Sequence, residues 1–190
     1  MTGSHLFWIT SRAAGVSALV LASLAVVAGL AIGLRGGPLR GRSAQLRTLH
    51  EALSLATLAA LGLHALALLG DGWLRPGLAG IAVPFAGTYR PLWTGLGIVA
   101  GYGLAALSLS YYFRARIGVA RWRALHRFIA GFWLLGVVHT LGSGTDAGEP
   151  WLLVLAAVVV LPPLALLGFR GCGWTVARRT IRLPACRPSR

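Results

Sequence analysis

The stretch 46–69, "LRTLHEALSLATLAALGLHALALL", decides the fold, because it is apolar enough and long enough to cross a bilayer as one helix. It nevertheless contains two histidines, His50 and His64, which are fourteen positions apart. A polar side chain inside a membrane is costly unless it has a partner or a function. The two imidazoles therefore need an explanation.

The rest of the chain is similarly apolar. Of its 190 residues, 56% are hydrophobic and 12% are charged, and the mean hydropathy is +0.73. In a typical soluble domain, roughly a quarter of the residues are charged. We predict an all-α integral membrane protein, a bundle of about five transmembrane helices enclosing two b-type haems. The expected spans are 13–34, 48–70, 92–113, 124–142 and 151–169. Pro162 and Pro163 should kink the last span.

The net charge of +14 comes entirely from arginine, and its distribution predicts topology rather than nucleic-acid binding. Fourteen arginines lie between spans one and two, between spans three and four, or after span five. The opposite side has only Arg12, Arg75 and Arg90. Because basic residues stay on the cytoplasmic side, we expect a multi-pass plasma-membrane protein with its N-terminus outside and its C-terminus in the cytoplasm.

A second expected span, 124–142, also carries two histidines, His126 and His139, thirteen positions apart. This span and the one at 48–70 run in the same direction, so each presents imidazoles at two depths about 20 Å apart. The arrangement suits two b haems, each held by one imidazole from each helix. An iron with two histidine ligands has no open position, which favours electron transfer. One Zn or Cu ion cannot bind ligands so far apart, and His5 is expected to be incidental.

The helical phases of the two spans differ. On an ideal helix, fourteen residues bring His64 within about 40° of His50, whereas thirteen leave His139 about 140° away from His126. Tilt, curvature, a π-bulge or different haem rotations would have to absorb this difference.

The paired histidines resemble those of the ferric reductase-like transmembrane domain family, which includes the membrane halves of ferric reductases and NADPH oxidases. Fourteen followed by thirteen is the NADPH-oxidase order of spacings. The stretch 83–97, "VPFAGTYRPLWTGLG", is similar to the family's outer connection and the helix after it. The stretch 11–24, "SRAAGVSALVLASL", is similar to the first helix of small bacterial members. The resemblance covers residues 8–170 and leaves 171–190 as a basic cytoplasmic tail.

This resemblance implies specific pairs of ligands. His50 and His126 would hold the haem on the cytoplasmic side, and His64 and His139 the haem on the outer side. Family members often place an aromatic residue between the haems, and Phe132 stands midway between the histidines of its span.

Arginines near the histidines are candidates for binding haem propionates, because Arg donates charge-assisted hydrogen bonds. Arg47 and Arg127 are close in sequence to the inner ligands, and Arg90, together with Arg12 and Tyr89, lies on the outer side. Topological anchoring explains the inner pair equally well. Glu51 could tune the neighbouring haem or act as a helix-dipole partner.

The chain differs from many eukaryotic members, which have six membrane helices and a dehydrogenase domain. It has five expected spans and no GxGxxG motif in a strand–helix unit. We therefore expect an oxidoreductase component, a ferric reductase-like cytochrome b, that receives electrons from a separate flavoprotein or membrane quinol. The outer acceptor could be ferric iron, oxygen, a flavin-bearing partner or a periplasmic reductase such as one repairing methionine sulfoxide. Few outer acidic residues are present, which favours a protein acceptor.

Two other functions stay open. One is a non-redox membrane protein, such as a small transporter or an anchor subunit, although the spans contain no central acidic residue of the kind transporters use. The other is a quinol-oxidising cytochrome b subunit, which would share the haems but take electrons from the membrane pool.

Overall fold

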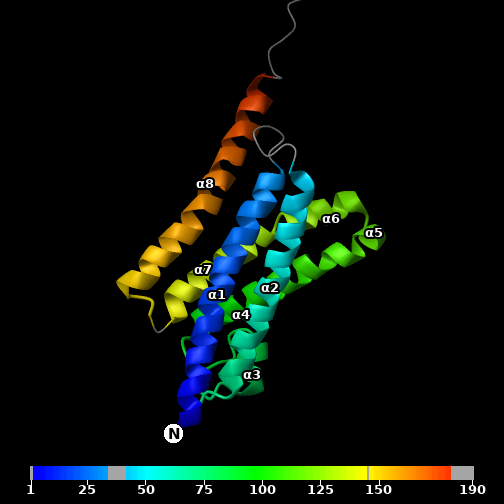
Figure 1. Cartoon of the computed structure of the whole chain (residues 1–190). Helices are drawn as coiled ribbons and strands as arrows, with labels where there is room; N and C mark the ends of the chain where they lie inside the picture. The colour runs from blue at the N-terminus through cyan, green and yellow to red at the C-terminus, as the bar shows by residue number, and fades with distance from the viewer. Residues whose placement is uncertain (1, 34–41, 145, 181–190) are drawn as a thin grey trace, which may run out of the picture.

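The computed structural model describes residues 2–33, 42–144 and 146–180, with side chains from 5 to 169 of these. The described chain is helical and contains no strand. Its elements, labelled in Figure 1, are α1 (Thr2–Ile32), α2 (Ser43–Leu69), α3 (Gly77–Ala82), α4 (Pro91–Leu109), the 3₁₀ helix η1 (Ser110–Phe113), α5 (Arg114–Ile117), α6 (Val119–His126), α7 (Ile129–Ser143) and α8 (Pro150–Thr180).

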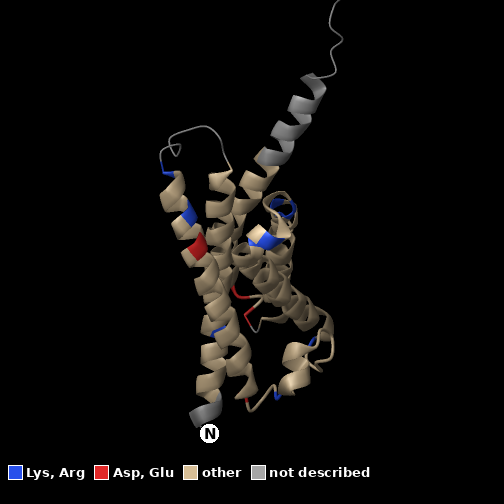
Figure 2. Cartoon of the chain, turned by 90° about the vertical axis from the view of Figure 1, so that its right-hand side faces the viewer, with Lys and Arg blue, Asp and Glu red and all other residues tan. Residues whose placement is uncertain are grey.

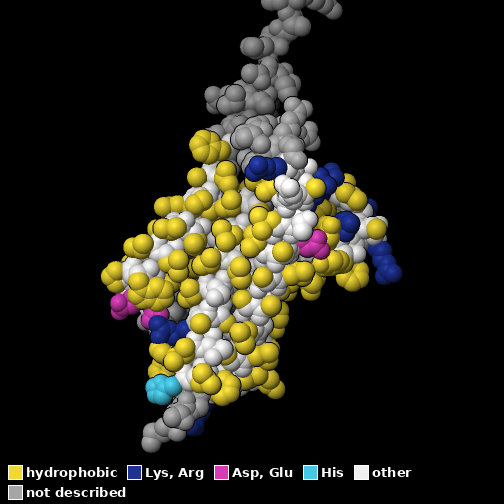
Figure 3. All heavy atoms as spheres, in the orientation of Figure 1, with side chains coloured by type: hydrophobic (Ala, Val, Ile, Leu, Met, Phe, Trp, Pro, Cys, Tyr) yellow, Lys and Arg dark blue, Asp and Glu magenta, His cyan; other side chains and the backbone are white. Residues whose placement is uncertain are grey.

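The prediction of an all-α protein with five membrane-spanning helices is confirmed at this level. Within the described residues, five helical segments are long and apolar enough to cross a bilayer: His5–Ile32, Ser43–Leu69, Pro91–Ile117, Val119–Ser143 and Pro150–Phe169. Hydrophobic side chains cover most of the face shown in Figure 3. The arginines in Figure 2 lie mainly at helix ends and connections. The surface is therefore that of a protein embedded in lipid.

Two boundaries differ from the sequence expectation. The first span begins at His5 rather than near residue 13, because α1 already starts at Thr2 and residues 6–9 are apolar. α8 passes through Pro162 and Pro163 as one continuous element and runs on to Thr180. The first part of the expected tail is thus helical, whereas residues 181–190 lie outside the described part of the chain.

The span that carries His126 and His139 is two helices rather than one. α6 ends at His126 and α7 begins at Ile129. Between them, Phe128 N–H donates to the Leu125 carbonyl (3.0 Å) and Gly131 N–H to the Phe128 carbonyl (2.9 Å). These are i→i−3 bonds of a tighter turn. This break means that the phase difference of about 140° for an ideal helix does not apply.

Each helix that carries membrane histidines packs on a neighbouring helix that carries none of these four residues. α1 and α2 lie side by side along their length, and α4 packs on α7 (Figure 1). α2 and α7 are not among the helix pairs packed extensively against each other. Small buried residues of α1 let α2 and α8 approach it closely: Ala14, Ala18, Ala22, Ala25 and Ala28.

The core lies around Trp133, which is 1% exposed and packs with Leu19, Leu104 and Val137. Its indole N–H donates to the Ser23 hydroxyl of α1 at 3.0 Å. This bond links the α4–α7 pair to the α1–α2 pair.

Candidate functional site: two facing histidine pairs

The structure brings the four membrane histidines together in two pairs. The rings of His50 and His126 have their centres 6.2 Å apart with planes at 85°. The rings of His64 and His139 have their centres 6.4 Å apart with planes at 75°. Fourteen residues of α2 separate the pairs, which is about 20 Å along a helix. Each of α2 and the α6–α7 span therefore contributes one imidazole at each of two depths.

The Nδ1 atom of every one of these histidines faces a backbone carbonyl of a neighbouring helix. The distances are 2.8 Å for His50 to Ala25, 2.8 Å for His64 to Ser11, 2.9 Å for His139 to Trp93 and 3.4 Å for His126 to Leu107. A carbonyl oxygen only accepts hydrogen bonds, so Nδ1 carries the hydrogen. Nε2 then keeps its lone pair, which is the form of imidazole that binds a metal.

For His64, His50 and His139, the residue whose carbonyl accepts the Nδ1 hydrogen bond is followed one helical turn later by a glycine. On α1 these glycines are Gly15 and Gly29. A Cβ at Gly15 would lie 3.1 Å from His64 Nδ1, and one at Gly29 would lie 3.0 Å from His50 Cε1. The absence of a side chain at these positions lets each ring approach the backbone of the neighbouring helix.

The same device recurs on α4. Gly97 follows Trp93 by one turn, and a Cβ on Gly97 would overlap the His139 ring. His126 is the exception, because Tyr111 occupies the corresponding position after Leu107. Its Nδ1 contact is the longest of the four, and its ring stacks on Trp122 of α6, with centres 5.0 Å apart and planes at 29°.

Serine hydroxyls distinguish the His64–His139 pair from the other. Ser11 Oγ lies 3.1 Å from His64 Nδ1 and Ser143 Oγ lies 3.0 Å from His139 Nδ1. Each hydroxyl also donates to the carbonyl of the same histidine. The serine oxygen is thus free to accept from Nδ1–H, alongside the backbone carbonyl. Among the described residues, no hydroxyl accompanies Nδ1 of His50 or His126 in this way.

The distances within each pair fit a metal ion lying between two imidazoles. Two metal–nitrogen bonds of about 2.0–2.1 Å, with each nitrogen about 1.1 Å from its ring centre, put the ring centres about 6.3 Å apart. Within the described residues, no group of three or more His, Cys, Asp or Glu could bind a metal. A metal ion held by one of these pairs would thus have two ligands of these types, and a metal that belongs to a larger bound group would bring its other ligands with it. Two facing imidazoles are a ligand set that would hold the iron of a b haem, so the residues present fit that group.

The arginines predicted near the first pair lie at what we call the basic end of the bundle, which contains Arg42, Arg47, Arg114, Arg116, Arg121 and Arg123. Arg47 and Arg127 are both exposed, and Arg127 Nε donates to the Ala124 carbonyl at 3.0 Å. Glu51 accepts a hydrogen bond from Tyr112 O–H at 2.9 Å. This bond joins α2 to η1 beside His50.

The opposite end, which we call the loop end, contains the connection 71–90 and the residues 144 and 146–149. Arg90 Nη1 donates to the Gly142 carbonyl at 2.7 Å, and Tyr89 O–H to the Ser143 carbonyl at 3.4 Å. Both bonds satisfy carbonyls at the end of α7. Arg12 forms an ion pair with Asp146. The predicted outer arginines thus hold the structure around His139 together.

Phe132 and Trp133 point to different neighbours. A Cβ on Gly103 of α4 would overlap the Phe132 ring, so that ring packs against α4. Trp133 lies in the core on Ser23. His5 is exposed near the start of α1.

Sequence reasoning missed the residues that hold the imidazoles from behind. One signal was present, because Gly15 and Gly29 are fourteen apart, as are His50 and His64. Two antiparallel helices with matching spacings predict two matching contacts. Ser143, Gly97 and Trp122 offered no comparable pattern.

Comparison of the chain with protein families, with curated proteins and with solved structures found no match. Membership of the ferric reductase-like family therefore stays a prediction based on the histidine pattern.

Proposed function

We propose that this protein is the membrane component of a reductase system and carries electrons across the membrane, with His50 and His126 holding one b haem and His64 and His139 holding a second. The observation that carries the proposal is the two facing imidazole pairs. In each pair the distance between ring centres fits a metal ion bound by both imidazoles. Each histidine also has its Nδ1 atom directed at a backbone carbonyl.

The histidines, carbonyls and glycines of such a site have different roles. The two histidines of a pair would hold one haem between them, and a haem held by two histidines is suited to electron transfer. The carbonyls of α1 and α4 fix the tautomer and the orientation of the rings. Each haem, when bound, supplies a one-electron iron couple. The glycines keep the rings close to the helices that hold them.

The depth of the two pairs supports transfer across the bilayer. About 20 Å along α2 covers most of a hydrocarbon core that is about 30 Å thick. The concentration of arginine at the basic end supports a cytoplasmic location for that end. We therefore place the electron donor, a flavoprotein or a quinol, beside His50 and His126. The acceptor, most simply a protein, binds at the loop end.

The decisive experiment is a reduced-minus-oxidised visible spectrum of the purified chain, with haem and polypeptide quantified in the same sample. We expect a b-type spectrum with about two haems per chain, one for each bis-histidine site. A chain that is helical by circular dichroism, was expressed with ample haem and holds none would overturn the proposal. That result would favour a non-redox transporter or anchor.

A second measurement separates the two classes of donor. The haem-loaded protein is mixed with a reduced soluble quinol or with a reduced flavoprotein, and the rate of haem reduction is followed. Reduction by the quinol that a quinone-site inhibitor blocks would assign a quinol-oxidising cytochrome b subunit. Reduction only by the flavoprotein would assign the component of a reductase chain.

A further inference from the structure

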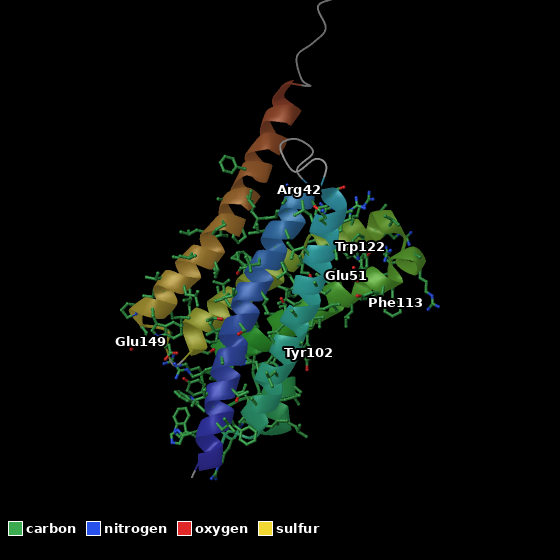
Figure 4. The ribbon with its side chains drawn as sticks, in the orientation of Figure 1. Arg42, Glu51, Tyr102, Phe113, Trp122 and Glu149 are labelled. Carbon is green, nitrogen blue, oxygen red and sulfur yellow. The ribbon has the colours of Figure 1, made fainter. Side chains whose placement is uncertain are left out.

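Trp122 is the aromatic residue closest to the proposed ligands at the basic end. It lies on α6, one turn before His126, and its ring stacks on that imidazole at 5.0 Å. The Tyr111 ring of η1 also packs against Trp122, with the two ring centres 5.8 Å apart. Figure 4 labels Trp122 at the end of the bundle where Glu51 also lies.

The indole nitrogen of Trp122 is buried and has no acceptor among the described residues. Buried indole N–H groups nearly always have a partner. The core residue Trp133 shows this rule in the same protein, because its N–H donates to Ser23 at 3.0 Å. An unpaired donor beside a metal-binding imidazole therefore indicates a missing acceptor.

The charge around Trp122 indicates that this acceptor is anionic. The Arg114 guanidinium lies 3.9 Å over the Tyr111 ring, and its Nη1 donates to the Tyr111 carbonyl at 2.8 Å. The nearest described carboxylate on α2, Glu51, already accepts from Tyr112. A buried N–H in a cluster that also holds a guanidinium, here through Tyr111, is suited to a carboxylate, because hydrogen bonds to charged acceptors are the strong ones.

We propose that the Trp122 N–H donates a hydrogen bond to a carboxylate of the group held between His50 and His126. The inference rests on the proposed function, and the carboxylate of a b haem is a propionate. Trp122 then has two roles at this site. Its ring holds His126, where the glycine found behind the other three histidines is absent, and its N–H binds the cofactor.

The test compares haem with haem dimethyl ester, which lacks propionate charge, in binding titrations of the haem-depleted full chain. A His139→Ala background leaves the pair at the basic end as the only complete site. In that background, Trp122→Phe keeps a stacking ring and removes the N–H. We expect haem to bind about 10- to 100-fold more weakly, which is the factor for one hydrogen bond to a charged group. The ester should lose much less affinity than haem on the same substitution, because its carbonyl is a neutral and therefore weaker acceptor for the indole N–H.

Two controls keep the outcome specific. In a His126→Ala background, where the His64–His139 pair remains, Trp122→Phe should leave haem affinity unchanged, which also shows that the variant folds. Trp122→Tyr restores a donor on a ring and should recover part of the loss. Unchanged haem affinity in Trp122→Phe, or an equal loss with haem and ester, overturns the inference and leaves the proposed function intact. Failure of the unsubstituted chain to bind haem at all overturns both.

Discussion

His64 and His139 face each other from two helices with ring centres 6.4 Å apart, and each turns its Nδ1 toward the carbonyl of a third or fourth helix. Neither ring is placed by its own helix alone. α1 holds one of them through Ser11, and α4 holds the other through Trp93. The geometry of the pair therefore depends on how two helix pairs pack.

Loss of a single ligand should remove a single haem. His64→Ala or His139→Ala deletes one of the two proposed ligands of the loop-end haem, and we expect haem content to fall from about two to about one per chain. His50→Ala and His126→Ala should do the same at the basic end. His5→Ala, which changes an exposed residue, is the control and should keep both. Haem and protein are quantified in each purified variant, and an unchanged ratio in the ligand variants would contradict the assignment.

Gly97→Ala should weaken the loop-end site without changing any ligand. The new methyl group would overlap the His139 ring, so either the ring or α4 must move. Overpacking of this kind costs about 1–3 kcal/mol, which corresponds to haem binding roughly 5- to 150-fold more weakly.

The matched control is Gly101→Ala, one turn further along α4, where a Cβ meets open space. It should bind haem normally, which a titration of each variant would check. Equal losses in both variants would mean that α4 simply tolerates no alanine, and the specific role of Gly97 would be rejected.

Ser143→Ala should raise the midpoint potential of the loop-end haem. Accepting a hydrogen bond from Nδ1–H makes the imidazole a stronger donor to iron and favours the oxidised state, so losing one of two acceptors acts in the opposite direction. A neutral hydrogen bond contributes about 0.5–1.5 kcal/mol, and only part of it differs between oxidation states, so we expect roughly 10–40 mV.

Ser54→Ala is the control for this shift. Ser54 donates to the His50 carbonyl at 2.7 Å, as Ser143 does to that of His139, but it has no contact with Nδ1. A spectroelectrochemical titration of both variants should show a shifted haem midpoint potential in Ser143→Ala and unchanged potentials in Ser54→Ala. A shift of the same size in Ser54→Ala would assign the effect to the helix backbone.

Ser23→Ala should destabilise the whole bundle. It removes the acceptor of the Trp133 N–H, which then stays buried without a partner at a cost of about 1–3 kcal/mol. Unfolding in detergent, followed by circular dichroism, should show a lower midpoint than for the unsubstituted protein. Ser17→Ala, on an exposed position of the same helix, should leave the midpoint in place.

Local properties of the sequence were sufficient to predict the membrane helices. An apolar run of about 20 residues must become a helix in lipid, since its backbone has no other hydrogen-bonding partner there. The same reasoning marked His50, His64, His126 and His139, because a polar group at such a position is costly. What it could not predict was the break at Arg127–Phe128, because that departure from a regular helix depends on how α6 and α7 pack.

The sequence by itself therefore determined an all-helical membrane protein with two histidines on each of two spans. Only the tertiary structure decided which carbonyl fixes each imidazole, that Arg12 and Arg90 bind other parts of the protein, and that Trp122 stacks on His126. The physical reason is the separation along the chain of the residues that interact. Hydrophobic length is a property of consecutive residues, whereas a contact such as that between Gly15 and His64 exists only after two helices have packed.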